Sequence, residues 1–170
     1  KRGSYRAVVS LANDAGVLTS FFDNKSQFCQ NQIDCNSGDQ RYISTNIDFS
    51  ASGSLAGKSL SSYAFRWRGL IRSDDVSEYT FSVSTVNDTA ASVTLWIDNQ
   101  LVLSSSTTAK ISVGTIALHQ EFGLYDFQLI YVAENPSTSA GLTLKWKSGQ
   151  SNFVIIPAIN FFQRMDLPIT

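Results

Sequence analysis

The sequence predicts an all-β domain, a single antiparallel β-sandwich or barrel-like fold. Apolar and polar residues alternate along most long segments, which is the pattern of half-buried strands. Turn residues recur about every eight to twelve positions, a spacing typical of sandwiches and barrels. No stretch carries a sustained apolar repeat of three to four residues, which argues against helices. The chain has 170 residues, of which 43% are hydrophobic, so it is long enough for one domain with its own core.

The N-terminal half contains the first predicted strands. The apolar stretch Tyr5–Ala12 precedes an Asn-Asp-Ala turn, after which Gly16–Phe22 forms a second strand. Residues 27–62 are polar and rich in Ser, Asn and Gly, so we expect a long decorated loop there, with one short strand at "NIDFS". The segments Tyr63–Arg72 and Glu78–Val86 then alternate and are joined by "SDDVS".

The C-terminal half follows the same pattern. The segment "VTLWID" alternates, and Asp98-Asn99 turns the chain into "LVLSS", so together they predict a β-hairpin. The strand "AKISVGTIAL" follows. The segments Gly123–Ala133 and Gly141–Ser148 predict a second hairpin around "ENPSTS", and short strands at "FVIIP" and "INFF" close the chain.

Alternation with a period of two also predicts the core of the sandwich. The three tryptophans, Trp67, Trp96 and Trp146, each lie inside an alternating strand. They could form a sugar-stacking platform or pack in the core, and we favour core packing. The predicted core residues are Phe65, Trp67, Phe81, Leu95, Leu129, Leu144 and Trp146.

The charge balance excludes some partners. Thirteen basic and fourteen acidic residues give a net charge of -1, and no basic patch suggests nucleic acid. There is no apolar run long enough to enter a bilayer and no signal peptide. Because the chain opens with Lys1-Arg2-Gly3 rather than Met, we expect residues 1–170 to be a single domain of a longer extracellular or cell-surface protein.

The two cysteines favour an oxidising compartment. Cys29 and Cys35 lie six positions apart in a polar segment, and a disulfide between them is the preferred interpretation. A redox or metal pair is the alternative, although the spacing is not Cys-x-x-Cys and the chain has one histidine. Glycosylation sequons begin at Asn24 and Asn87, which agrees with an extracellular glycoprotein.

Catalytic motifs are missing from the sequence. His119 lies at the end of a predicted strand with no nucleophile motif nearby, so we expect a surface or structural role. There is no nucleophile elbow, phosphate-binding glycine loop or zinc-protease motif. Asp74 and Asp75 lie in a turn, where we expect them to be solvated. The domain is therefore predicted not to be an enzyme, although it could be an accessory domain attached to one.

Five motifs occur in order along the chain: "GVLTSFFDN", "FRWRGLIRSDDVSEYTFSV", "VNDTAASVTLWIDNQLV", "LYDFQLIYVAENPSTSAGLTLKW" and "VIIP". This set resembles the anthrax protective-antigen-type (PA-14) domain family. The resemblance runs from about Gly16 to Phe162 and keeps the family spacing outside residues 27–62. It implies a β-sandwich module of the kind found beside glycosidases, in fungal adhesins, in bacterial toxins and in cell-surface proteins.

The resemblance also implies a calcium site. In the family's adhesins a calcium ion at one end of the sandwich ligates sugar hydroxyls, held by two adjacent aspartates and by a second loop. Carried over by motif, calcium would be bound by Asn87, Asp88, Glu134 and Asn135. Asn87, Asp88 and Asn135 would also contact the sugar. Side-chain and main-chain oxygens from two loops suit calcium, which takes about six to eight of them.

Two functions remain open at this stage. The first is a calcium-dependent, carbohydrate-binding module of lectin or adhesin type. The second is a structural or protein–protein interaction module without sugar binding. The presence of Asp88 and of Glu134-Asn135 favours the first. Asn87, which stands where the family has aspartate and begins a sequon, favours the second.

Overall fold

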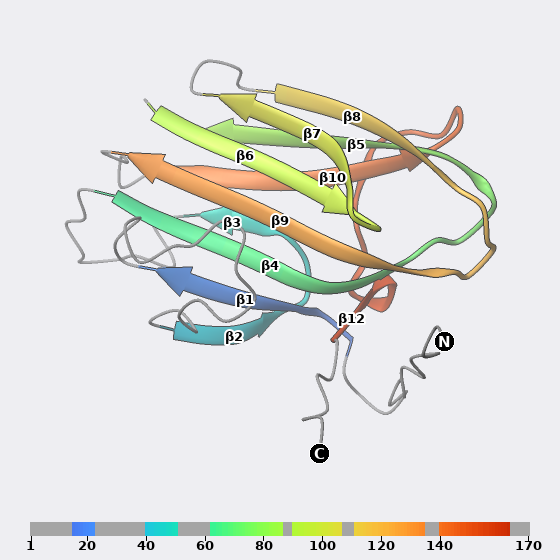
Figure 1. Ribbon diagram of the computed structural model, residues 1–170, viewed down its shortest axis with the longest axis horizontal. Coiled ribbons are helices and arrows are strands. Elements are labelled where there is room, and N and C mark those ends of the chain that lie inside the picture. Colours follow the sequence, from blue (N-terminus) through green and yellow to red (C-terminus); the bar gives the residue numbers. More distant parts are fainter. Residues whose placement is uncertain are drawn as a thin grey trace, which may run out of the picture.

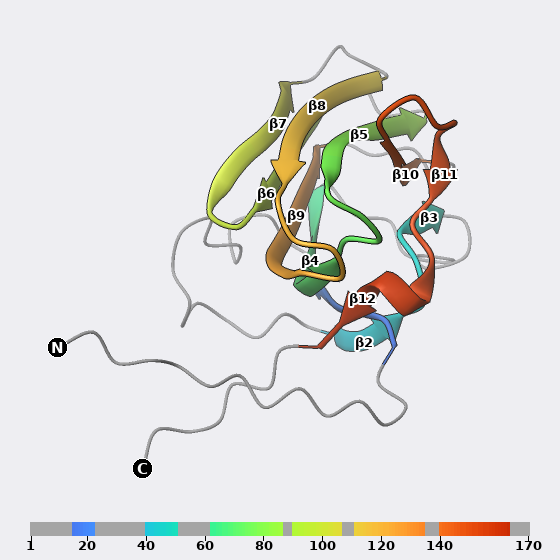
Figure 2. The same ribbon diagram turned by 90° about the vertical axis from the view of Figure 1, so that its right-hand side faces the viewer.

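A computed structural model describes residues 15–22, 40–50, 62–86, 90–106, 111–134 and 140–163 of the chain. These residues form an antiparallel β-sandwich with one short 3-10 helix (Figures 1 and 2). Its elements are β1 Val17–Phe22, β2 Gln40–Ser44, β3 Asp48–Ser50, β4 Ser62–Arg72, β5 Ser77–Val86, β6 Ala90–Ile97, β7 Gln100–Ser106, β8 Ile111–Leu118, β9 Leu124–Glu134, β10 Gly141–Ser148, β11 Val154–Ile155, η2 Ala158–Asn160 and β12 Phe161–Phe162.

The strands are divided between two sheets. The larger sheet has the order β2-β1-β4-β9-β6-β7, with β12 also paired to β4. The smaller sheet has the order β11-β10-β5-β8, with β3 paired to β10. No ladder joins the two sheets among the described strands, so the fold is an open sandwich and the barrel-like alternative is wrong.

The core lies between the two sheets, as the alternation predicted. All seven predicted core residues are buried, from 0% exposed for Phe81 to 4% for Trp146, and they belong to one continuous cluster. Trp96 is the exception among the tryptophans, because it is half-buried and stands outside that cluster. Its neighbour Leu95 points into the core, so alternation turns Trp96 to the outer face. The prediction of core packing was wrong for Trp96.

The hairpin between β6 and β7 confirms the local turn prediction. Ile97 and Gln100 pair across a two-residue turn, in which Asp98 and Asn99 have φ angles of 51° and 61°. Such left-handed values at both central positions match the right-handed twist of the flanking strands, and Asp and Asn tolerate them better than most residues.

The predicted hairpin between β9 and β10 is wrong. Strand β9 pairs with β4 and β6 in the larger sheet, whereas β10 pairs with β3, β5 and β11 in the smaller one. The connection after Glu134 therefore crosses from one sheet to the other. Both strands bury their inner faces between the two sheets. The alternating pattern is the same whether β9 and β10 pair in one sheet or lie in facing sheets, so it does not specify a hairpin.

The decorated loop predicted at 27–62 contains more structure than expected. The short strand at "NIDFS" is confirmed as β3, but β2 was missed. Strand β2 pairs along β1, with Tyr42 opposite Thr19. The predicted strand Tyr5–Ala12 and the predicted disulfide between Cys29 and Cys35 lie outside the described residues. The disulfide stays a prediction, which thiol titration of the denatured, unreduced protein would check.

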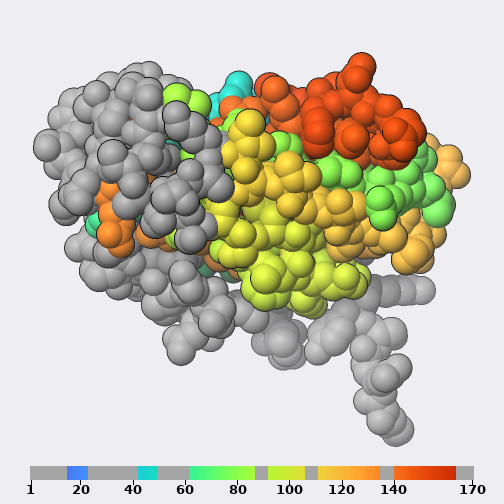
Figure 3. Space-filling view, turned by 90° about the horizontal axis from the view of Figure 1, so that it is seen from above, coloured from blue at the N-terminus to red at the C-terminus, as the bar shows by residue number. Residues whose placement is uncertain are grey.

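On one side of the sandwich, the edge strands β7 of the larger sheet and β8 of the smaller sheet pack closely against each other without pairing. Figure 3 shows this side from above, where β7 and β8 form neighbouring bands. A Cβ atom added at Gly114 would lie inside van der Waals contact of the Val102 carbonyl group and 2.9 Å from the Leu103 Cβ. Glycine at this position therefore allows the two edge strands to approach each other.

Candidate functional site at the loop end of the sandwich

Strand registers bring two loops to the same end of the sandwich. Ala90, the first residue of β6, lies opposite Glu134, the last residue of β9. Val86, the last residue of β5, lies opposite Gly141, the first residue of β10. The β5–β6 and β9–β10 loops therefore start and finish beside each other. We call this end, marked by Val86, Ala90, Glu134 and Gly141, the loop end (left in Figure 1).

The structure describes one of the four predicted calcium ligands directly. Glu134 is exposed at the end of β9, where its backbone pairs with both β4 and β6. Asn87, Asp88 and Asn135 lie outside the described residues, as does the sequon at Asn24. In the chain, Asn87 follows Val86 and Asn135 follows Glu134, so both segments begin from described residues of the loop end. Within the described part of the chain, no group of three or more His, Cys, Asp or Glu side chains could hold a metal ion.

Two aspartates at the opposite end have a structural role that the sequence analysis missed. Asp75 accepts hydrogen bonds from the Tyr79 hydroxyl and the Ser148 hydroxyl, both at 2.8 Å. Asp74 accepts one from the Asn160 amide at 2.7 Å. These bonds tie the β4–β5 turn to β10 and to η2. Both aspartates are exposed, as expected for solvated turn residues, but long-range partners also reach their carboxylates.

Further hydrogen bonds join two turns and η2 at this end, which faces the viewer in Figure 2. The Ser73 backbone amide donates to the Gly123 carbonyl at 3.1 Å, and the Asn160 side-chain amide donates to the Arg72 carbonyl at 2.9 Å. We call this end the turn end; it comprises the β4–β5 and β8–β9 turns and η2. Three apolar side chains remain more than half exposed there: Val76 at 61%, Phe122 at 58% and Ile159 at 60%.

Tyr79 is the centre of the turn-end network and offers a test of it. Its hydroxyl accepts from the backbone amides of Asp74 and Asp75, at 2.9 and 3.1 Å, while donating to Asp75. Tyr79→Phe removes these bonds but keeps the buried ring, so we expect the free energy of unfolding to fall by about 2 kcal/mol. Urea denaturation of the two proteins at neutral pH measures the difference. Equal stability would contradict this account.

The same hydroxyl predicts a pH dependence. Burial is the main cause that raises the pKa of Tyr79 above its ordinary value. A raised pKa means that the folded state holds the proton more tightly than the unfolded state. The stabilisation is therefore complete below about pH 10 and is lost as the pH rises through the folded-state value. Above about pH 10, wild-type stability should fall more steeply than that of Tyr79→Phe, as urea denaturation at each pH would show.

Other parts of the described surface offer little catalytic chemistry. His119 is exposed just after β8, as expected for a surface residue.

No helix in the described part of the chain has the length and apolar character needed to span a membrane.

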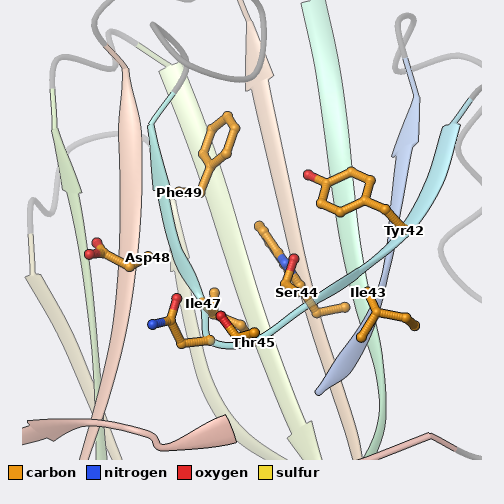
Figure 4. A pocket seen from close by; sticks show the side chains of 9 residues that line it. Tyr42, Ile43, Ser44, Thr45, Ile47, Asp48 and Phe49 are labelled. Atoms are coloured by element: carbon orange, nitrogen blue, oxygen red, sulfur yellow. The ribbon is translucent and has the colours of Figure 1, made fainter. Parts of the chain in front are cut away.

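A cavity that the sequence analysis missed lies on the side of the sandwich, beneath the turn between β2 and β3. This cavity is open to solvent and has a volume of about 290 Å³, and its walls include Tyr42, Phe49 and Trp67 (Figure 4). Tyr42 lies within the predicted loop at residues 27–62. Its position in "RYIS", which is separated from "NIDF" only by Thr45, was the available signal for a strand there.

The geometry defines a two-sheet β-sandwich with paired loops at one end, and comparisons with known proteins agree with that class. The model of the PA14 domain family matches residues 14–158, so the chain belongs to the PA14 domain family. Among curated proteins, protective antigen of Bacillus anthracis is 33% identical over 97 residues. That match covers 55% of this chain and 11% of protective antigen.

Solved structures share the same fold. An anti-sigma factor domain-containing protein from Clostridium clariflavum has a TM-score of 0.66 and 28% identity, covering 89% of this chain and 48% of that one. A structure described as the PA14 sugar-binding domain from an RTX adhesin has a TM-score of 0.64 and 13% identity. It covers 88% of this chain and 99% of that one. The chain thus spans about half or less of protective antigen and of the Clostridium protein.

Proposed function

We propose that this domain is a non-catalytic carbohydrate-binding module that holds sugar hydroxyls through a calcium ion at the loop end. Asn87, Asp88, Glu134 and Asn135 would supply oxygen ligands, and open positions on the ion would accept vicinal hydroxyls. In this proposal the module acts outside the cell or at its surface, as part of a longer chain. Weak single-site binding would be strengthened by several copies acting together.

The strand register is the observation that carries the proposal. Glu134 lies opposite Ala90, and Gly141 lies opposite Val86, so the two loops with all four candidate ligands leave neighbouring strands at one end. Calcium takes carboxylate, amide and main-chain oxygens without strict geometry, which suits two adjoining loops. The similarity to a domain described as sugar-binding, although low in sequence identity, supports the same class of ligand.

A calcium titration of thermal stability tests the ion site. A ligand that binds only the folded state stabilises it by about 1.4 kcal/mol at ten times its Kd, which should raise the Tm by about 3 to 6 °C. Because Asn87 carries no charge, we expect a Kd of about 10⁻⁴ to 10⁻³ M. Asp88→Ala should abolish the calcium-dependent shift, and Asn87→Asp should strengthen it.

Controls separate the ion site from general stability. Asp74→Ala and Asp75→Ala should lower the Tm without calcium, because both side chains are hydrogen-bonded, yet should keep the calcium-dependent shift. Binding to immobilised glycans should be lost both with a chelator and with Asp88→Ala. A Tm that does not respond to millimolar calcium would reject the site.

An interaction module is the second candidate function, and the turn end favours it. Val76, Phe122 and Ile159 are exposed apolar residues on two turns and η2, which hydrogen bonds join. A rigid apolar surface of this kind could contact a neighbouring domain or a protein partner. Two results would support this alternative. The wild-type protein would not respond to calcium, and Phe122→Ser would change self-association or partner binding.

A further inference from the structure

The cavity beneath the turn between β2 and β3 is formed by edges of both sheets. Strand β2 ends the order of the larger sheet, while β3 pairs with β10 in the smaller one. The turn between them is fixed to β10, because the Leu144 amide donates to the Ile47 carbonyl at 2.9 Å. The Thr143 hydroxyl also donates to Asp48 at 2.8 Å. The cavity therefore has a framework held by both sheets.

Aromatic rings form much of the cavity wall. Trp67 is 2% exposed, and the Phe49 ring packs 4.3 Å from the ring of Phe65, so both are fixed by the core. Tyr42 is 40% exposed, and Figure 4 shows its hydroxyl turned toward the space between its own ring and Phe49. The cavity thus offers a fixed apolar floor and one accessible ring at its edge.

Polar groups complete the lining and indicate the charge of a ligand. Ser44, Thr45 and Asn46 carry uncharged hydroxyl and amide groups, and none of the described lining residues is basic. The one carboxylate among these described residues is that of Asp48, which already accepts from Thr143. An anionic ligand would find no cation among these residues. The Ser44 hydroxyl already pairs with the Thr19 hydroxyl at 2.7 Å, but a purely apolar ligand would cover the exposed side chains of Thr45 and Asn46 without hydrogen-bonding them.

We propose that this cavity is a calcium-independent subsite for one ring of a neutral saccharide. A pyranose ring has an apolar face that can stack on an aromatic side chain, here Tyr42, and hydroxyls that can pair with Ser44, Thr45 and Asn46. A volume of about 290 Å³ lies at the small end of ligand pockets and suits a single ring. The subsite goes beyond the proposed function, because it needs neither the ion nor the loop end.

Amide NMR of isotopically labelled protein tests the subsite. The probes are the methyl glycosides of glucose, galactose, mannose and N-acetylglucosamine, each added alone in the presence of EDTA. We expect at least one of them to shift the amide signals of residues 42–49, with a Kd on the order of 1 mM. Glucuronic acid should produce weaker shifts, because it brings a negative charge to a site whose described lining residues include Asp48 and no basic side chain.

Three substitutions at the cavity and one control outside it separate recognition from folding. Tyr42→Ala should weaken binding about tenfold through loss of stacking, whereas Tyr42→Phe should weaken it only about two- to threefold. Asn46→Ala, at an exposed turn position, should weaken binding while keeping the dispersed spectrum of a folded protein. Phe153→Ala is the matched control, because Phe153 is also 40% exposed but does not line the cavity. Saccharide binding by this variant should be unchanged.

The outcomes distinguish this subsite from the proposed ion site. Binding that persists in EDTA and in Asp88→Ala, and that weakens in Tyr42→Ala, supports the subsite whether or not calcium binds at the loop end. Shifts limited to the loop-end strands, binding that EDTA abolishes, unchanged affinity of Tyr42→Ala, or no response to any of the four glycosides would overturn it.

Discussion

Replacing Phe65 by alanine is expected to lower the free energy of unfolding by about 3 to 5 kcal/mol. Phe65 is 1% exposed on β4, and its ring centroid lies 4.9 Å from that of Phe21 and 5.5 Å from that of Trp67. Alanine would remove these contacts and leave a cavity. Because β4 is paired with β1 on one side and β9 on the other, the backbone cannot collapse into the space. Urea denaturation followed by tryptophan fluorescence measures the loss.

Two variants define the scale of this effect. Phe65→Leu keeps most of the buried volume and should cost about 1 to 2 kcal/mol. Phe153→Ala removes an aromatic ring that is 40% exposed and should cost about 0.5 to 1 kcal/mol, including its contact with the Lys147 ammonium. A loss for Phe65→Ala no larger than that for Phe153→Ala would contradict the position of Phe65 in the core.

Gly114→Ala is expected to destabilise the protein by about 3 kcal/mol, although it adds one methyl group. The new Cβ would overlap the Val102 carbonyl and lie 2.9 Å from the Leu103 Cβ, so the backbones of β7 and β8 would have to separate. A flexible side chain could move aside, but a carbonyl group within a sheet cannot do so without losing ladder hydrogen bonds. Thermal and urea denaturation would both report the change.

The neighbouring residue provides the control for this substitution. Thr115 is exposed on the same strand, and Thr115→Ala should change stability by about 0.5 kcal/mol. Both variants alter β8 at adjacent positions, and only Gly114→Ala forces the two sheet edges apart. Similar small losses in the two variants would show that β7 and β8 do not pack as closely as described.

Features of the fold that depend on neighbouring residues could be predicted from the sequence. The alternation of β4, β5 and β10 placed Trp67, Phe81 and Trp146 in the core, where they are buried. The Asp98-Asn99 turn was predicted because these residue types tolerate the positive φ angles observed there. Trp96 could also have been placed correctly, since the alternation that turns Leu95 inward turns its neighbour outward.

Pairing between distant segments could not be predicted in the same way. Strands β9 and β10 follow one another with a short connection, so a hairpin was the natural expectation, yet they belong to different sheets. Alternation specifies which face of a strand is buried but not which strand lies beside it. The partners of Asp74 and Asp75 were missed for the same reason, because Ser148 and Asn160 are more than seventy residues away along the chain.

The sequence by itself determined the all-β class and the alternating core, because both follow from local residue patterns. Local motifs also carried the resemblance that selected the oxygen-rich segments at Asp88 and Glu134. The tertiary structure decided that the flanks of those segments meet at one end, through the pairing of Glu134 with Ala90. It also decided that Tyr42 and Trp67 line one cavity. Their strands, β2 and β4, are separated in the sheet by β1. Such neighbourhoods arise from the pairing of strands and the packing of sheets, which bring together residues that no local pattern connects.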